Sequence, residues 1–348
     1  MAVYTTIDDP QADFQIKLYT GNGTNSQAQT FSGAVDMQPD MVWIKQRSGT
    51  AENALTDAVR AVDGYLCTNT SAAENSGSAH MQSLDTNGFS PGLAATMGAS
   101  TETYVAWCWK AGTTSGLTGG TITPSSYSIN TTNGLGMYQY TGTGSAGTIA
   151  HGLGVAPDMI FVKRTDGTAN WQVQHTSLDA DKVLYLNTNH AEQNEIMFND
   201  TYPTSTVFSL GTPSESNGSG NVYMAYCFAP VKGYSNFSSY VANGNADGAF
   251  IYTGFRPALI FTKEADATSS WMVFDNKRDG YNDNNPKLSW NDSGGDTGAA
   301  ADLVDILSNG FKIRSTSSEV GTSGNTYVYG AWAESPFVNS SGVPTNAR

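Results

Sequence analysis

The chain has 348 residues, a formal net charge of −14 and 14% charged residues, well below the ~25% typical of globular proteins. Its 17 Tyr, 14 Phe and 7 Trp exclude a disordered chain, and its few charges exclude a long coiled coil. No apolar run approaches the ~18 residues of a membrane helix and no basic, apolar leader is present, so we expect neither a membrane span nor a secretory signal. Because an acidic surface repels phosphates and anionic lipids, we expect no nucleic-acid or membrane partner, whereas sugars and proteins remain open.

The chain contains an internal threefold repeat. A proline, a short apolar run and a lysine occur at 39–45 (PDMVWIK), 157–163 (PDMIFVK) and 257–263 (PALIFTK), and an aromatic motif follows each at 104–111, 223–230 and 327–334. This order of landmarks predicts three domains, residues 1–116, 117–234 and 235–348, which we call repeats 1, 2 and 3; repeat 3 includes a short C-terminal tail. The first boundary is rich in Gly, Ser and Thr, whereas the second is short, so we expect repeats 2 and 3 to touch.

Apolar runs of four to eight residues, separated by Gly-containing turn pairs, predict β-strands throughout. In the first motif Met41, Trp43 and Lys45 should face one way, and Val42 and Ile44 the other. Both faces are apolar before the lysine, so this strand should lie between two layers. Helical periodicity is confined to short stretches at 52–63 and 298–310. The sequence therefore predicts an all-β protein of three tandem β-sandwiches of the jelly-roll kind.

Few residues suggest a catalytic centre or a metal site. Cys67, Cys108 and Cys227 form neither a disulfide framework nor a zinc cluster, and position 108 aligns with Cys227 and Ala331, which indicates a small buried core position. The four histidines lack metal-ligand spacing, and no nucleophile or phosphate-binding motif occurs. We therefore expect no enzyme, no cofactor and no metal.

Two acidic residues precede an arginine by three positions in aligned places of the repeats. Asp57 with Arg60 aligns with Asp275 with Arg278, while repeat 2 has His175 at this position. We interpret both as duplicated structural salt bridges rather than as the carboxylate pair of a glycosidase. Another position diverges between copies, since repeat 1 has Asn53 where the other repeats have Trp171 and Trp271.

The loop 275–296 is the candidate ligand-binding segment. Tyr281 and Trp290 offer aromatic faces to a sugar, and Asp279 and Asp283 offer hydrogen-bond acceptors. One alternative is that Trp290 fills the core of its own repeat. Asp279, Asn282, Asp283 and Asn285 could also supply oxygen ligands to Ca²⁺, but they do not match an EF-hand, and a solvated turn is the expected form of such a loop.

The segments 243–282 and 140–164 and the final motif at 327–337 resemble a domain found in structural proteins of marine bacteriophages. The resemblance extends over all three repeats and implies a concanavalin-like jelly roll in a tail-fibre-like or other virion protein. It provides no active-site residues.

The resemblance leads to the expectation of a virion structural protein on the outer surface of the particle. The first reading is a tail fibre or host-recognition appendage that binds a cell-surface glycan or protein, and the alternative is a capsid decoration or head spike without a ligand. A polysaccharide depolymerase is disfavoured because no aligned acid pair falls in a plausible cleft. Other virion proteins and copies of the same chain, arranged as a trimer, are the expected partners.

Overall fold

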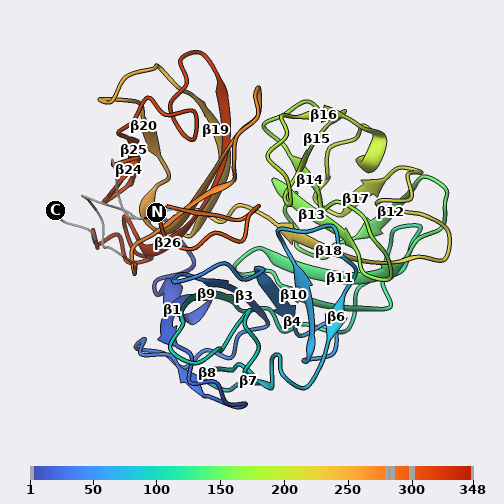
Figure 1. Cartoon of the computed structure of the whole chain (residues 1–348). Helices are drawn as coiled ribbons and strands as arrows, with labels where there is room; N and C mark the ends of the chain where they lie inside the picture. Colours follow the sequence, from blue (N-terminus) through green and yellow to red (C-terminus); the bar gives the residue numbers. More distant parts are fainter. Residues whose placement is uncertain (1–3, 279–281, 283–286, 298–301, 346–348) are drawn as a thin grey trace.

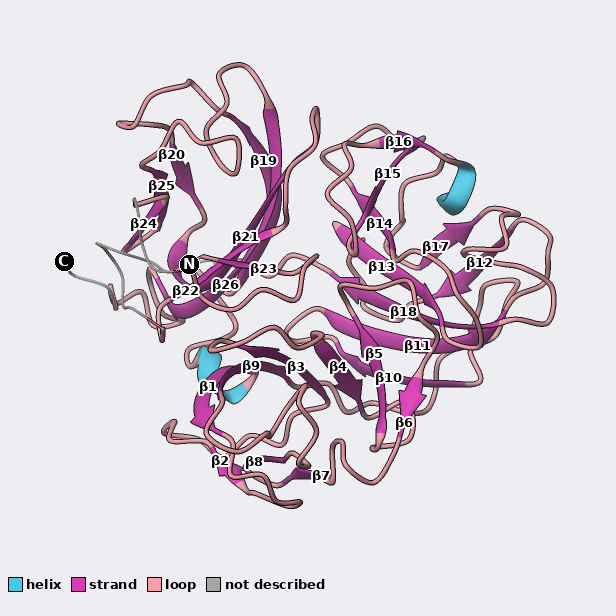
Figure 2. Cartoon of the chain, in the orientation of Figure 1, coloured by secondary structure: helices cyan, strands magenta, loops and turns pink. Residues whose placement is uncertain are grey.

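The structure, a computed structural model, describes residues 4–278, 282, 287–297 and 302–345 and confirms the all-β prediction (Figures 1 and 2). Within these residues the helical elements are two 3₁₀ turns, η1 (Pro10–Ala12) and η2 (Ile196–Phe198). No helix in the described part of the chain is long and apolar enough to cross a membrane. The stretch 52–63 contains a strand and a turn instead of a helix.

Repeat 1 forms a six-stranded sheet in the order β1-β9-β3-β4-β5-β6 and a small sheet in the order β2-β8-β7. All of its pairings are antiparallel. The strands are β1 (Phe14–Thr20), β2 (Gln29–Thr30), β3 (Met41–Gln46), β4 (Ala54–Asp57), β5 (Gly64–Cys67), β6 (Asn75–Ser76), β7 (Ser83–Asp85), β8 (Gly88–Ser90) and β9 (Thr103–Trp109).

Repeat 2 has the same plan, with a large sheet in the order β10-β11-β18-β13-β14-β15-β16 and a two-stranded sheet of β12 and β17. The strands are β10 (Ser126–Asn130), β11 (Leu135–Thr141), β12 (Gly147–Ala150), β13 (Met159–Arg164), β14 (Gln172–His175), β15 (Lys182–Tyr185), β16 (Gln193–Asn194), β17 (Val207–Leu210) and β18 (Val222–Phe228).

Repeat 3 repeats the plan once more, with a large sheet in the order β19-β26-β21-β22-β23 and a small sheet in the order β20-β25-β24. The strands are β19 (Ser235–Val241), β20 (Phe250–Tyr252), β21 (Phe255–Glu264), β22 (Met272–Asp275), β23 (Leu288–Ser289), β24 (Val304–Leu307), β25 (Gly310–Ile313) and β26 (Thr326–Pro336). Each sheet therefore draws its strands from one repeat. The finer expectation of a concanavalin-like jelly roll and the residue boundaries of the domains stay predictions.

Each large sheet is buried on both faces, as the apolar strands predict. Val42 and Ile44 face the small sheet of their own repeat and form a core with Phe89. Met41 and Trp43 face the other way, into a second core. The predicted alternation along β3 is confirmed.

The second core is shared by all three repeats. Trp43 and Trp107 from repeat 1, Phe161 from repeat 2, and Phe261 and Trp332 from repeat 3 belong to one buried cluster. Figure 1 shows the three repeats as three lobes around this centre, coloured blue to cyan, green to yellow, and orange to red. The repeats are therefore consecutive in sequence but surround a common core, and none can expose its inner sheet face without opening that core.

Equivalent backbone hydrogen bonds join the repeats in cyclic order. The donors are the amide groups at aligned positions of the three repeats, and each acceptor is a carbonyl of the next repeat. The bonds are Glu74 N to Thr165 O (2.8 Å), Glu192 N to Ala265 O (2.8 Å) and Asp296 N to Arg47 O (2.7 Å). The order 1 to 2, 2 to 3 and 3 to 1 closes a ring with approximate threefold symmetry. We call the three contacts the 1–2, 2–3 and 3–1 interfaces.

The lysine of the repeated strand motif is buried in all three repeats, and in repeats 1 and 2 it reaches across an interface. Lys45 Nζ donates to the carbonyl of Asp292 across the 3–1 interface (2.8 Å), and Lys163 Nζ donates to the carbonyl of Ser71 across the 1–2 interface (3.0 Å). Burial lowers the pKa of Lys45, Lys163 and Lys263 to about 8, so each stays largely protonated at neutral pH. The charged ends therefore act as donors to main-chain oxygens inside the ring.

At the 3–1 interface the tryptophan comes from the opposite repeat than at the other two interfaces. Trp171 Nε1 donates to Cys67 O and Trp271 Nε1 to Tyr185 O, both at 2.9 Å, whereas Asn53 Nδ2 reaches Trp290 O at 2.9 Å. Where repeat 1 lacks the tryptophan, the ring of Trp290 from repeat 3 stacks on the ring of Trp43. The ring centroids are 4.1 Å apart and the angle between the ring planes is 22°. The positions equivalent to Trp290 hold Thr68 and Leu186. The small and large side chains have exchanged sides at the 3–1 interface.

Candidate binding site between repeats 1 and 3

The structure corrects the role expected for Trp290. Its side chain is completely buried between Trp43 and Phe261, so its ring offers no platform to a sugar. It fills the core shared by the repeats, rather than only that of its own repeat as the alternative had it. Asp279, Tyr281 and Asp283 lie outside the described residues.

The aligned Asp–Arg pairs are buried salt bridges, as predicted. Arg60 Nη2 lies 2.7 Å from Asp57 Oδ2, and Arg278 Nε lies 2.6 Å from Asp275 Oδ2, with all four side chains at most 1% exposed. Each aspartate also accepts a hydrogen bond from the following repeat in the ring, from Tyr226 OH to Asp57 (2.7 Å) or from Trp107 Nε1 to Asp275 (3.4 Å). Both carboxylates are buried and paired within the protein, which is the arrangement of a structural salt bridge.

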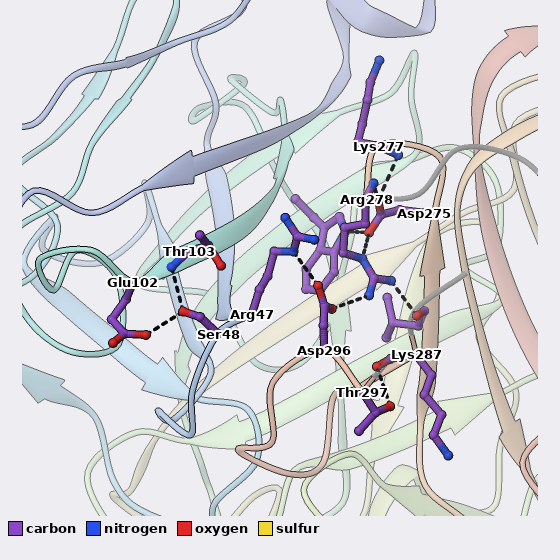
Figure 3. A network of polar contacts seen from close by, with 12 residues as sticks. Arg47, Ser48, Glu102, Thr103, Asp275, Lys277, Arg278, Lys287, Asp296 and Thr297 are labelled. Atoms are coloured by element: carbon purple, nitrogen blue, oxygen red, sulfur yellow. Dashed lines mark hydrogen bonds and ion pairs between the residues drawn. The ribbon is translucent and has the colours of Figure 1, made fainter. Parts of the chain in front are cut away.

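At the 3–1 interface the salt bridge extends into a chain of ion pairs (Figure 3). Asp296 Oδ1 lies 2.9 Å from Arg278 Nη1, and its Oδ2 lies 2.6 Å from Arg47 Nε of repeat 1. Burial alone would lower the pKa of Arg278, but the carboxylates of Asp275 and Asp296 raise it above its ordinary value. The chain fixes the edge of repeat 3 against repeat 1.

Repeat 2 replaces the aspartate by His175, which predicts an acid-sensitive contact. His175 Nε2 lies 3.3 Å from Tyr329 O of repeat 3, and burial lowers its pKa to about 4. Since the unfolded histidine has a pKa of ~6.5, protonation favours the unfolded chain as the pH falls from 6.5 to 4, by up to about 3 kcal/mol. We expect urea unfolding of His175→Asn to lack this part of the pH dependence. Equal pH profiles for the two proteins between pH 7 and pH 4 would contradict the assignment.

The described residues contain no group of three or more His, Cys, Asp and Glu side chains placed to hold a metal ion. Cys67, Cys108 and Cys227 are free and buried, and burial raises the pKa of Cys67 to about 11. The interpretation of Cys108 and Cys227 as core positions agrees with this burial.

A pocket of about 70 Å³ opens between repeats 1 and 3. Repeat 1 contributes β1, η1 and the turn after Phe31, and repeat 3 contributes β21, β26 and the turn after β22. Apolar and neutral polar groups line most of it, and charged groups stand at Lys17, Lys277 and Glu334. The neutral lining residues are Gln11, Phe14, Gln15, Ile16, Phe31, Ser32, Gly33, Ala258, Asn276 and Ala333.

Gln15 presents a fixed acceptor in this pocket. The residue is 8% exposed, and its Nε2 donates to Gln11 O at 2.9 Å and Val35 O at 3.4 Å, which fixes the amide orientation. Its Oε1 forms no hydrogen bond with the described residues. A Cβ on Gly33 would stand 2.9 Å from this oxygen, so the glycine leaves the acceptor open.

Asn276 carries an amide that the protein leaves unpaired. The residue is 8% exposed, and neither Nδ2 nor Oδ1 has a partner among the described residues. The alignment explains why. In repeat 2, Asp158 accepts from Thr176 Oγ1 at 2.9 Å, and repeat 3 has Ala258 and Asn276 at these two positions. Loss of the carboxylate has left the amide beside the pocket without its internal acceptor.

This site could not be predicted from the sequence because its residues come from five segments that only the ring brings together. A signal was nevertheless present, since the repeated proline is followed by aspartate in repeats 1 and 2 but by Ala258 in repeat 3. This departure from the internal repeat coincides with the place where the structure has an unsatisfied group.

Comparison with known proteins gives a family and no named relative. No curated protein and no solved structure matches the chain. Residues 9–336 match the family described as "Domain of unknown function (DUF7483)", a span that covers repeat 2 and most of repeats 1 and 3. The chain therefore belongs to the DUF7483 family.

Proposed function

We propose that this protein is a structural component of a bacteriophage virion, exposed on the outer surface, where it serves as a tail-fibre or host-recognition module that binds a cell-surface glycan. The phage assignment rests on the resemblance of all three repeats to marine phage structural domains. The observation that favours a ligand-binding role is the 3–1 pocket, with its open Gln15 acceptor and its unpaired Asn276 amide.

The ring architecture supports a role on a particle surface. The three repeats surround one buried core, which ties them together, and the net charge of −14 opposes clumping of many copies on one particle. We propose no catalytic activity. Oligomerisation into a trimer stays part of the proposal, and a monomer mass at micromolar concentration would contradict it.

The test is to locate the protein on purified particles by mass spectrometry and immunogold electron microscopy. Label at the tail is the expected result and supports host recognition. Label on the head would replace this role by the alternative, a capsid decoration or head spike. Absence of the protein from purified particles would overturn the virion assignment.

A further inference from the structure

We propose that the pocket between repeats 1 and 3 binds a single neutral sugar unit through adjacent hydroxyl groups, with Gln15 and Asn276 as its main polar partners. The biological role of this site rests on the proposed function, whereas the chemical class of the ligand is inferred from the residues of the pocket alone.

The two side-chain amides of the pocket, Gln15 and Asn276, match hydroxyls better than ions. Gln15 Oε1 can only accept a hydrogen bond, and the Asn276 amide can both donate and accept. A hydroxyl also does both, so two adjacent hydroxyls can satisfy Nδ2 and Oδ1 of one amide. An anion would leave both acceptors unpaired, and a cation would leave the Asn276 donor unpaired.

The apolar groups of the pocket complete the match. Phe14, Phe31, Ala258 and Ala333 line it beside the amides. A sugar ring presents hydroxyls at its edge and C–H groups on its faces, so one ring satisfies both kinds of wall. The volume of about 70 Å³ is far below the ~300–1,000 Å³ of drug-sized sites, which indicates one ring held at its edge rather than an enclosed oligosaccharide.

The unpaired amide of Asn276 lowers the stability of the folded chain, and a hydrogen bond to a ligand would remove this loss. A buried polar group without a partner destabilises the folded chain, and repeat 2 avoids this cost with the Asp158–Thr176 hydrogen bond. The Asn276 side chain is almost wholly covered, so we infer that its amide turns about the Cβ–Cγ bond to meet a hydroxyl at the pocket wall. Binding should therefore perturb its side-chain NH₂ resonance.

The experiment titrates the intact chain with methyl glycosides of glucose, galactose and mannose, followed by saturation-transfer NMR and by the Asn276 side-chain signal. We expect at least one glycoside to bind and its fully O-methylated form to fail. Methyl glucuronide tests the charge of the ligand, and we expect it to bind no better than the neutral glycoside.

Two variants test the site. Asn276→Leu should weaken binding about tenfold or more while the Tm stays equal or rises, because the variant removes an unsatisfied buried group. Gly33→Ala should also weaken binding, because the methyl group approaches Gln11 Oε1 (2.7 Å) and Gln15 Oε1 (2.9 Å). Asn282→Ala, which changes an exposed asparagine outside the pocket lining, is the matched control and should bind normally.

Binding that both pocket variants leave unchanged would overturn the proposal, as would failure of all three neutral glycosides to bind. These results are separate from the location of the protein. If the protein binds a glycoside but is absent from particles, the sugar site is supported and the virion role is contradicted. If the protein is found at the tail but binds no glycoside, the virion role is supported and the sugar site is contradicted.

Discussion

Trp290→Ala is expected to lower the free energy of unfolding by about 3–5 kcal/mol, the range for removing a large buried aromatic side chain. Trp290 is wholly buried. The centroid of its ring lies 4.1 Å from that of Trp43, 5.0 Å from that of Phe261 and 6.1 Å from that of Trp107. Its loss leaves a cavity at the 3–1 interface, inside the core that all three repeats share. Urea or thermal unfolding measures the effect. A loss below 1 kcal/mol would contradict this role in the common core.

The same interface permits a test by double substitution. Asn53→Trp alone should destabilise the chain because a second large ring competes with Trp290 for the space beside Trp43. Asn53→Trp combined with Trp290→Thr copies the pair Trp171 and Thr68 of the 1–2 interface, and it should be less destabilised than the sum of the two single changes by at least about 1 kcal/mol. Additive losses would show that the two positions do not compensate.

Asp57→Asn is expected to cost about 3 kcal/mol or more, since breaking one side of a buried ion pair leaves the other charge poorly compensated. Asp57 accepts hydrogen bonds from Val59 N, from the main chain and guanidinium of Arg60, and from Tyr226 OH. The variant therefore weakens a turn and an inter-repeat contact together. The equivalent change, Asp275→Asn, should behave alike because its carboxylate has the same arginine geometry.

A surface pair provides the control for this prediction. Arg164 and Asp166 form an ion pair at 2.7 Å, but their side chains are 26% and 35% exposed. Asp166→Asn should change stability by no more than about 1 kcal/mol. If Asp57→Asn cost no more than Asp166→Asn in denaturant unfolding, the buried pair would not have the structural role assigned to it. Binding of a glycoside should survive both changes, because neither residue lines the pocket.

The all-β fold could be predicted from the sequence because the same local pattern of apolar residues occurs in each repeat. A strand motif with apolar residues on both faces predicted a sheet buried on two sides, and β3 shows this with Val42 and Ile44 on one face and Met41 and Trp43 on the other. The same pattern does not reveal what the second face packs against. That face meets other repeats, and the packing of distant segments depends on the ring rather than on periodicity.

The candidate site was less predictable for the same reason. Trp290 stands in a polar stretch of sequence, which left open whether its ring faces solvent or the core. The space that it fills lies beside Asn53, more than 230 residues away, where repeat 1 lacks the tryptophan of the other repeats. Gln15 and Asn276 show no motif, and their importance follows from hydrogen bonds that are absent in the folded chain. Alignment of the repeats contained part of this information at Asn53 and Ala258, because both positions break the internal pattern.

The exchanged side chains at the 3–1 interface also bear on how the chain avoids assembly errors. Three similar repeats synthesised one after another could pair in the wrong order, or with a repeat of another molecule, because much of the backbone bonding is equivalent at every interface. A copy of repeat 1 has no tryptophan at position 53 to fill the space beside Thr68, and a copy of repeat 3 would bring Trp290 against Trp171 or Trp271. In the native order each junction contains one tryptophan of the pair, with Thr68, Leu186 or Asn53 as its partner. In the reverse order Trp290 would meet Trp171, so the exchange at the 3–1 interface distinguishes the two orders of the repeats around the ring.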